Sequence, residues 1–242
     1  MRNIKKILYH LQTGKKFLVK DLDEDYNTQF GIIPKAELKK EIAESNKAQK
    51  FLILEPNFTD LWENLTRGPQ LMLPKDIGLI LARTGVNSQS KVVDAGGGSG
   101  SLCLSLANVC KEVTVYEVNK EHFEILTKNK KLFGLNNLNL KLANVYDGIA
   151  EKNLDLITLD LPEPWRVVES AQNSLKLGGF LVIYLPNLNQ VKQFIDSTHN
   201  SSIKVLETLE LIERKWKIED KIMRPEFEML GHTGFLTFCR RL

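Results

Sequence analysis

Residues 91–110 read KVVDAGGGSGSLCLSLANVC, and this stretch decides the fold class. It begins with a short β-branched run, breaks into glycines and continues at once into an apolar segment of helical length. Glycines allow a sharp backbone turn and a close approach to a ligand, and the first turn of a helix presents unpaired N–H groups. A strand, a glycine loop and a helix in this order predict the opening of an α/β domain with a ligand-binding loop.

The alternation of strands and helices continues beyond this stretch. The sequence predicts further strands at 113–117, 138–144, 154–160 and 180–186, and helical segments at 119–134, 164–176 and 187–197. Such alternation is typical of right-handed βαβ units and a mostly parallel sheet covered on both faces. Residues 204–218 and 234–241 predict two extended strands with a long connection, which suits an antiparallel edge.

The first 55 residues lack this alternation, because glycines and prolines separate short apolar runs there. A small β-rich module is the expected structure. A chain of 242 residues is long enough for one full domain and a small extra one. We therefore expect an N-terminal module over 1–60 and an α/β domain over 61–242.

The composition is ordinary for a soluble globular protein, with 43% hydrophobic and 26% charged residues. No stretch approaches the roughly 20 apolar residues of a membrane span. Lysines interrupt every apolar cluster of the N-terminal segment, which does not resemble a signal peptide. Three scattered cysteines form no CxxC pair and no metal-ligand spacing, so we expect a cytoplasmic protein without a metal site.

Positive charge is concentrated at the two ends of the chain. Residues 1–50 carry 11 Lys and Arg against 7 Asp and Glu, and residues 214–242 carry 7 against 4. Residues 51–213 carry 15 against 19. These counts fit ordinary solvated lysines, and they also fit a polyanion held by basic ends around an acidic site.

The details of the glycine loop discriminate between ligands. A dinucleotide fingerprint would place Ser101 where Gly or Ala belongs, and a phosphate-binding P-loop would need a lysine that is absent. The acidic-x-Gly-x-Gly-x-Gly pattern of Asp94, Gly96, Gly98 and Gly100 instead resembles motif I of S-adenosylmethionine-dependent methyltransferases.

Polar residues end four successive predicted strands: Asp94, Glu117, Asn144 and Asp160. Open α/β sheets bind their ligands at the carboxyl ends of the strands. Glu117 is placed to accept both ribose hydroxyls of an adenosine, although a solvated strand end would also explain it. Four polar ends in a row predict a binding site.

Longer motifs make the resemblance more specific. The chain from about Tyr26 onward resembles the tRNA (adenine-N1)-methyltransferases of the TrmI type, which methylate the adenine at position 58 of the tRNA T-loop. The motifs are TQFGII, RGPQLMLPKDIGLIL (67–81), DAGGGSG, DLPEPW (160–165), LKLGGFLVIYLPNLNQV (175–191) and the closing MRP…GHTGFLTFCRR.

The resemblance implies a Rossmann-like methyltransferase fold with S-adenosyl-L-methionine as cofactor and tRNA as partner, in a homotetramer. The residues it implies for the cofactor are Asp94, Gly96, Gly98, Ser99, Gly100, Ser101, Glu117, Asn144, Val145 and Asp160. The glycine loop would hold the methionine and ribose end, Glu117 the ribose, and Asn144 with Val145 the adenine. Relatives carry Asp where Asn144 stands, but an amide carbonyl can still accept from the adenine amino group.

On the substrate side, the resemblance implies that Asp160 faces the target base as the catalytic residue and that the N-terminal module positions tRNA. Leu73 stands where relatives have Tyr or His beside the base. Trp165 either flanks the base or packs under its own helix, and the prolines of DLPEPW make a stiff shelf. Arg224 and His232 are candidates for phosphate or rim contacts, and a structural role is an equal alternative for His232.

Three other functions remain open from the sequence. The chain could methylate another nucleobase, or a small molecule such as a precorrin. It could also be a non-catalytic tRNA-binding subunit, although an intact glycine loop with Glu117 and Asp160 argues for catalysis.

Overall fold

The computed structural model describes residues 4–68 and 70–242, which form two compact units. One unit comprises the residues up to Thr66 together with Lys128–Gly134, and the other comprises Arg67–Thr127 and Leu135–Leu242. Across the described residues, every helix is too short or too polar to cross a membrane. The assignment of 1–60 and 61–242 to separate domains stays a prediction.

The first unit is rich in short strands, as expected. Its elements are β1 (Lys6–His10), β2 (Lys16–Val19), β3 (Tyr26–Thr28), β4 (Gly31–Ile33), η1 (Glu37–Lys39), β5 (Ile42–Glu44), β6 (Lys50–Leu54) and α1 (Phe58–Glu63). Four of the strands form an antiparallel sheet in the order β2-β1-β6-β5. Leu8, Val19 and Phe51 are fully buried in its core, and the His10 ring stacks on Phe30 with the centroids 3.9 Å apart.

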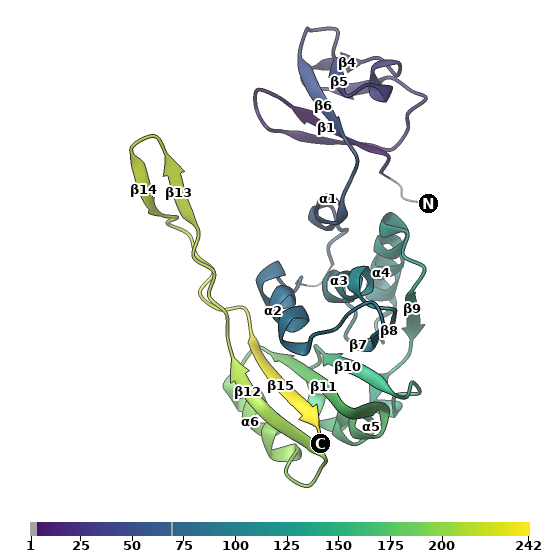
Figure 1. The fold of residues 1–242 in the computed structure, drawn as a ribbon, viewed down its shortest axis with the longest axis vertical. Helices are drawn as coiled ribbons and strands as arrows, with labels where there is room; N and C mark the ends of the chain where they lie inside the picture. Colours follow the sequence, from purple (N-terminus) through teal and green to yellow (C-terminus); the bar gives the residue numbers. More distant parts are fainter. Residues whose placement is uncertain (1–3, 69) are drawn as a thin grey trace. The chain divides into compact units, whose positions relative to one another are not determined.

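The second unit carries the α/β domain (Figure 1). Its elements are α2 (Pro74–Thr84), β7 (Lys91–Ala95), α3 (Ser101–Val109), β8 (Glu112–Glu117), α4 (Lys120–Phe133), β9 (Leu138–Leu142), η2 (Val145–Asp147), β10 (Leu154–Leu159), η3 (Pro164–Val167), α5 (Val168–Ser174), β11 (Leu175–Leu185), α6 (Leu188–Ser197), β12 (Ile203–Leu209), β13 (Trp216–Glu219), β14 (Ile222–Pro225) and β15 (Phe235–Arg241). The final turn of α4, from Lys128, is grouped with the first unit.

The seven-stranded sheet of this unit has the order β12-β15-β11-β10-β7-β8-β9. The strands from β11 to β9 pair in parallel, while β15 runs antiparallel to both of its neighbours. This is the mostly parallel sheet with an antiparallel edge that the sequence predicts, and it confirms the Rossmann-like fold class.

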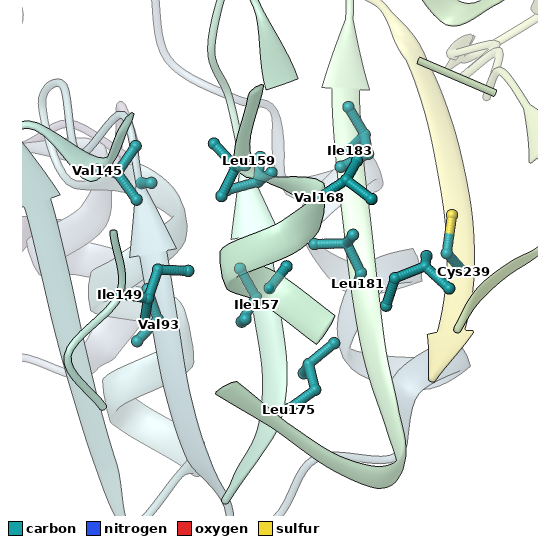
Figure 2. Close-up of a cluster of buried hydrophobic side chains, with 14 of the residues drawn as sticks. Val93, Val145, Ile149, Ile157, Leu159, Val168, Leu175, Leu181, Ile183 and Cys239 are labelled. Carbon is teal, nitrogen blue, oxygen red and sulfur yellow. The ribbon is translucent and has the colours of Figure 1, made fainter. Parts of the chain in front are cut away.

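An apolar core fixes the central strands. Ile157 of β10 and Leu181 of β11 point to the same face as Val168 of α5, and all three are buried (Figure 2). The whole run from Leu156 to Leu159 is buried, as is usual for a central parallel strand covered on both faces. The packing therefore holds the carboxyl end of β10, where Asp160 follows, in a defined position.

Two predicted elements differ from the structure. The single strand expected over 204–218 is wrong, because β12 ends at Leu209 and a separate antiparallel hairpin begins at Trp216, made of β13 and of β14 from the expected connection. A left-handed residue, Asp220 with φ +48°, makes the turn of this hairpin. The helix expected over 164–176 begins as η3 and ends at Ser174, where β11 begins.

Candidate functional site

A cavity of about 490 Å³ opens at the carboxyl ends of the parallel strands. Its size is typical of small-molecule sites, and its place is where open α/β sheets bind ligands. The sequence-predicted residues that line it are Asp94, Gly96, Gly98, Ser99, Ser101, Glu117 and Asp160. The fold therefore brings most of the predicted acidic and glycine residues together around one cavity.

Two positions of the glycine loop require glycine, because each has a positive φ and leaves no room for a Cβ atom. Gly96 has φ +92°, and a Cβ atom there would collide with the backbone oxygen of Asp160. Gly100, the N-cap of α3, has φ +93°, and its Cβ would lie 2.7 Å from Leu126 Cδ1. Larger residues at these positions would have to adopt a strained backbone and displace their neighbours.

The two serines of the loop also hold a neighbouring segment. Ser99 Oγ accepts a hydrogen bond from the backbone N–H of Gly68 (3.0 Å), and Ser101 Oγ accepts one from Met72 N–H (3.1 Å). Leu71 and Met72 line the cavity as a result. The sequence motif at 67–81 marked this region, but we did not expect these side chains in the wall.

Glu117 is held by backbone donors. Its side chain is 6% exposed, Oε2 accepts from Gly98 N–H (2.9 Å) and Oε1 accepts from Asn119 N–H (2.8 Å). Each oxygen keeps lone-pair capacity for a further donor such as a ribose hydroxyl. His122, for which no role was predicted, also lines the cavity, and its Nδ1 lies 4.0 Å from Glu117 Oε2.

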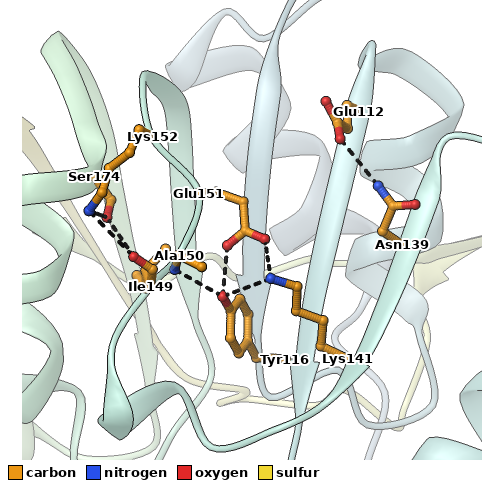
Figure 3. A network of polar contacts seen from close by, with 9 residues as sticks. All are labelled: Glu112, Tyr116, Asn139, Lys141, Ile149, Ala150, Glu151, Lys152 and Ser174. Atoms are coloured by element: carbon orange, nitrogen blue, oxygen red, sulfur yellow. Dashed lines mark hydrogen bonds and ion pairs between the residues drawn. The ribbon is translucent and has the colours of Figure 1, made fainter.

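A second network supports the same strand from the opposite face of the sheet. The hydroxyl of Tyr116 donates to Glu151 Oε2 (2.7 Å) and accepts from Lys141 Nζ and Ala150 N–H (Figure 3). Burial raises the pKa of Glu151, but the hydrogen bonds from Lys141 and Tyr116 outweigh it and hold that pKa below its ordinary value. The network fixes the end of β8, and with it the backbone of Glu117.

The cavity is strongly acidic. Burial raises the pKa of Asp94 to about 7, and the charges of Asp160 and Glu117 act in the same direction, against a hydrogen bond from Thr158 (2.5 Å). Asp160 lines the cavity, and desolvation by the surrounding protein raises the pKa of its carboxyl to about 6. Among the described residues that line the cavity there is no Lys or Arg, so this donor set fits a cationic ligand.

The turn after Asp160 is tied down at several points. Pro162 lines the cavity, and its carbonyl accepts from Gln190 Nε2 (3.1 Å) of α6. The backbone N–H of Glu163 donates to the Tyr146 hydroxyl (3.2 Å), and the Arg166 guanidinium lies 4.1 Å from the centre of the Tyr146 ring. Proline stiffness and these contacts together make a rigid shelf beside the carboxylate.

The cavity lining also contains residues that the sequence did not predict. Tyr184 and Pro186 come from the end of β11, and Thr233 from the segment leading into β15. Thr233 lies far from Tyr184 and Pro186 in the sequence, and the antiparallel pairing of β15 with β11 brings the two segments together. Thr233 belongs to the closing HTG motif, which was the one feature of the sequence that pointed to it.

The structure places the remaining predicted residues outside the cavity lining: Gly100, Asn144, Val145, Leu73, Trp165, Arg224 and His232. Asn144 caps η2 by accepting from Tyr146 N–H, and Leu73 is the N-cap residue of α2. Trp165 is half-buried in η3. Their functional roles stay predictions.

Arg224 and His232 are engaged within the chain. Arg224 lies on β14 with its guanidinium 3.7 Å from the centre of the Phe227 ring. His232 contacts Glu210 Oε2 through Nδ1 (2.8 Å) and the Pro186 carbonyl through Nε2 (2.9 Å). Both partners accept hydrogen bonds, and the pKa of His232 is raised, chiefly by Glu210.

Comparison with known proteins identifies the family. Residues 50–223 match the family described as "tRNA methyltransferase complex GCD14 subunit". The chain belongs to this family of tRNA methyltransferases. A relative from Methanocaldococcus jannaschii, named tRNA (adenine(57)-N(1)/adenine(58)-N(1))-methyltransferase TrmI, is 34% identical over 95% of this chain and 92% of its own length.

Two solved structures resemble this member of the GCD14 family over its whole length. The tRNA (m1A58) methyltransferase TrmI of Aquifex aeolicus has a TM-score of 0.79 and 27% identity, and 98% of its chain is covered. A protein of Thermotoga maritima described as a SAM-dependent O-methyltransferase has a TM-score of 0.86 and 27% identity, with 94% covered.

Proposed function

We propose that this protein transfers a methyl group from S-adenosyl-L-methionine to N1 of adenine 58 in the tRNA T-loop. The observation that carries the proposal is the match to TrmI over nearly the whole of both chains. The acidic cavity supports it, because a cationic methyl donor suits buried carboxylates without a neighbouring lysine or arginine among the described lining residues.

The residues of the cavity fit this cofactor, which supplies a methyl group on a positively charged sulfur. Glu117, oriented by two backbone donors, would accept the ribose hydroxyls. Asp94 and Asp160 would attract the positive charge, and the glycine loop lets the backbone approach the methionine end. Asn144 and Val145, which follow β9, remain the proposed contacts to the adenine.

Asp160 is the proposed catalytic residue. Adenine N1 is normally committed to base pairing, so the target base must be unpaired or flipped out to react. Methylation at N1 puts positive charge on the ring, and a carboxylate at the N6 edge favours that charge and can take the N6 proton. A carboxyl with a pKa of about 6 is largely ionised at neutral pH and is a stronger base than an ordinary aspartate.

The Asp160→Asn variant tests this role. We expect single-turnover methylation to fall at least ~100-fold, because the amide carries no charge and cannot take the proton. Binding of S-adenosylmethionine should weaken far less than the rate, because Asp94 and Glu117 remain, and binding of tRNA should change little. A purely structural carboxylate that caps the following turn would tolerate Asn, but the N-cap of η3 is Glu163 and no side chain caps it. Near-wild-type turnover of Asp160→Asn would remove it from the mechanism.

The substrate itself is tested by incubation with unmodified tRNA and labelled S-adenosylmethionine, followed by mass mapping of the modified nucleoside. We expect 1-methyladenosine at position 58. A 2′-O-methylated nucleoside would instead favour methyl transfer to an oxygen atom, as the name of the Thermotoga maritima protein suggests for that protein. Loss of the product when adenine 58 is replaced is the control for position.

We propose further that the first unit positions tRNA, that the active form is a homotetramer and that the protein works in the cytoplasm. The basic ends of the sequence support a polyanionic partner. Cys103, Cys110 and Cys239 are buried and free, as expected in a reducing compartment. Exposed apolar side chains on the β13–β14 hairpin support an assembly of several copies.

A further inference from the structure

A buried polar cluster lies beside the cavity, and the mechanism above does not use it. Lys75 Nζ donates to Asp76 Oδ1 (2.8 Å) and to Thr233 Oγ1 (2.7 Å), while the Thr233 hydroxyl donates to Asp76 Oδ2 (3.0 Å). The Lys75 side chain is 7% exposed and that of Asp76 is 0% exposed. The three groups thus form a closed triangle in which the hydroxyl both accepts and donates.

A buried ion pair of this kind usually has a specific structural or functional role. Removing two charges from water is costly, and apolar side chains of similar volume often give equal or greater stability. What apolar side chains do not give is a unique orientation of a hydroxyl group. The direction of the Thr233 hydroxyl is set by a donor on one side and an acceptor on the other, so its position is tightly defined.

The cluster joins the two walls of the cavity. Lys75 and Asp76 belong to the first turn of α2, directly after the wall residues Leu71 and Met72. Thr233 belongs to a second wall segment, the one that returns from the hairpin to β15. The two segments are about 160 residues apart in sequence, and the triangle connects them by direct side-chain contacts.

Thr233 is a close neighbour of Tyr184. Both residues line the cavity, the Thr233 side chain acts to lower the pKa of Tyr184, and the Tyr184 ring lies so close to the residue after Thr233 that a Cβ on Gly234 would be 2.5 Å from Tyr184 Cζ. Burial raises the pKa of Tyr184 to about 12, and the charges of Asp76 and Asp160 act in the same direction. The hydroxyl is therefore protonated at neutral pH and faces a cavity that Asp160 also lines.

We propose that Lys75, Asp76 and Thr233 form a positioning network that sets the Tyr184 ring and the spacing of the two cavity walls for the methyl-transfer step. The proposal rests on the proposed function, because the reacting base must enter between these walls. The network acts through Tyr184 and does not itself touch the base or the cofactor. Its loss should therefore lower the rate of the chemical step more than it weakens binding.

The test is Thr233→Val, which removes the hydroxyl, keeps the shape and leaves the Lys75–Asp76 pair intact. We expect the single-turnover rate to fall at least ~10-fold, with dissociation constants for S-adenosylmethionine and tRNA within about twofold of wild type. Thr233→Ser should restore most of the rate, because it returns the hydroxyl. The matched control is Thr208→Val, which breaks a hydroxyl contact to Thr237 (3.0 Å) between β12 and β15; neither residue lines the cavity, so the rate should not change.

A second readout does not depend on activity. The protein has five tyrosines, so 3-fluorotyrosine labelling gives few ¹⁹F signals, and Tyr184→Phe identifies the one from Tyr184. That signal should shift or broaden in Thr233→Val and stay unchanged in Thr208→Val. An unchanged signal together with a wild-type rate would overturn the proposal, as would a rate loss matched by an equal loss of tRNA affinity. Should wild type form no 1-methyladenosine, the proposed function fails, while the ¹⁹F result still decides whether the network positions Tyr184.

Discussion

Asp94 is the residue whose charge is most affected by its surroundings. It is 2% exposed, it lies between the charges of Asp160 and Glu117, and its carboxyl has a pKa of about 7. The protonated form of Asp94 is therefore favoured below neutral pH in the free protein. Binding of a cation reverses this preference, because the ionised form then has an opposite charge beside it.

This reversal predicts a pH-dependent affinity. A carboxyl with a raised pKa must lose its proton before it can attract the cofactor's charge, so affinity for S-adenosylmethionine should rise with pH and level off above about 7. We expect a gain of roughly 10-fold between pH 5.5 and 7.5, measured by calorimetry. Asp94→Asn should bind more weakly with a much flatter profile. S-adenosylhomocysteine, which lacks the sulfonium charge, should show a smaller dependence; equal slopes for the two ligands would contradict this explanation.

The acidic residues of the site could be predicted because each directly follows or ends a buried strand. Asp94, Glu117 and Asp160 interrupt apolar runs, and strand ends in a parallel sheet meet at one edge. Tyr184 and Thr233 gave no such signal. A tyrosine within an apolar strand looks like a core residue, and a threonine in a connection looks like a turn residue. Only the pairing of β11 with β15 brings them to the cavity.

At the scale of elements, the loop after β7 is tightly constrained. Gly96 N–H donates to the carbonyl of Tyr116 (3.0 Å), while its missing Cβ leaves room for the backbone of Asp160. The loop therefore links three neighbouring strands at the point where the cofactor is proposed to bind.

Gly96→Ala should disrupt this loop. The new methyl group would collide with backbone atoms, and a φ near +90° is itself strained for alanine. We expect binding of S-adenosylmethionine to become undetectable and the free energy of unfolding to fall by several kcal/mol. Gly85→Ala is the matched control, since Gly85 also has a positive φ of +64° but no atom within 4 Å of its Cβ position. It should bind cofactor normally and lose only about 1 kcal/mol. Normal binding by both variants would show that the close approach at Gly96 is not needed.

The β13–β14 hairpin was the element that the sequence did not predict. Its strands have four residues each, and the preceding segment from Glu210 to Lys215 contains no glycine or proline to mark the break. The sequence pattern typical of a strand thus continues from β12 into β13, with no residue that marks the end of β12. Asp220, in the left-handed conformation, was the one local turn signal, and a single aspartate is weak evidence for a turn.

At the scale of the whole molecule, this hairpin carries several exposed apolar side chains. Ile218 and Met223 are paired across the two strands and are each 72% exposed, and Phe227, which follows β14, is 87% exposed. Groups of exposed apolar side chains often mark protein–protein contacts. A second copy of this chain is the partner that the proposed homotetramer supplies.

Ile218→Thr combined with Met223→Thr tests that assignment. Threonine keeps a high strand propensity, so the hairpin should persist while its apolar surface is lost. We expect wild type to sediment as a tetramer and the double variant to dissociate into smaller species at micromolar concentration, because buried apolar area is the main attraction between subunits. Leu177→Thr is the control, since Leu177 is equally exposed, at 77%, but lies at the start of β11, outside the hairpin. It should leave the tetramer intact. A monomeric wild type would exclude the homotetramer, and a double variant that stays tetrameric would place the subunit contacts elsewhere on the chain.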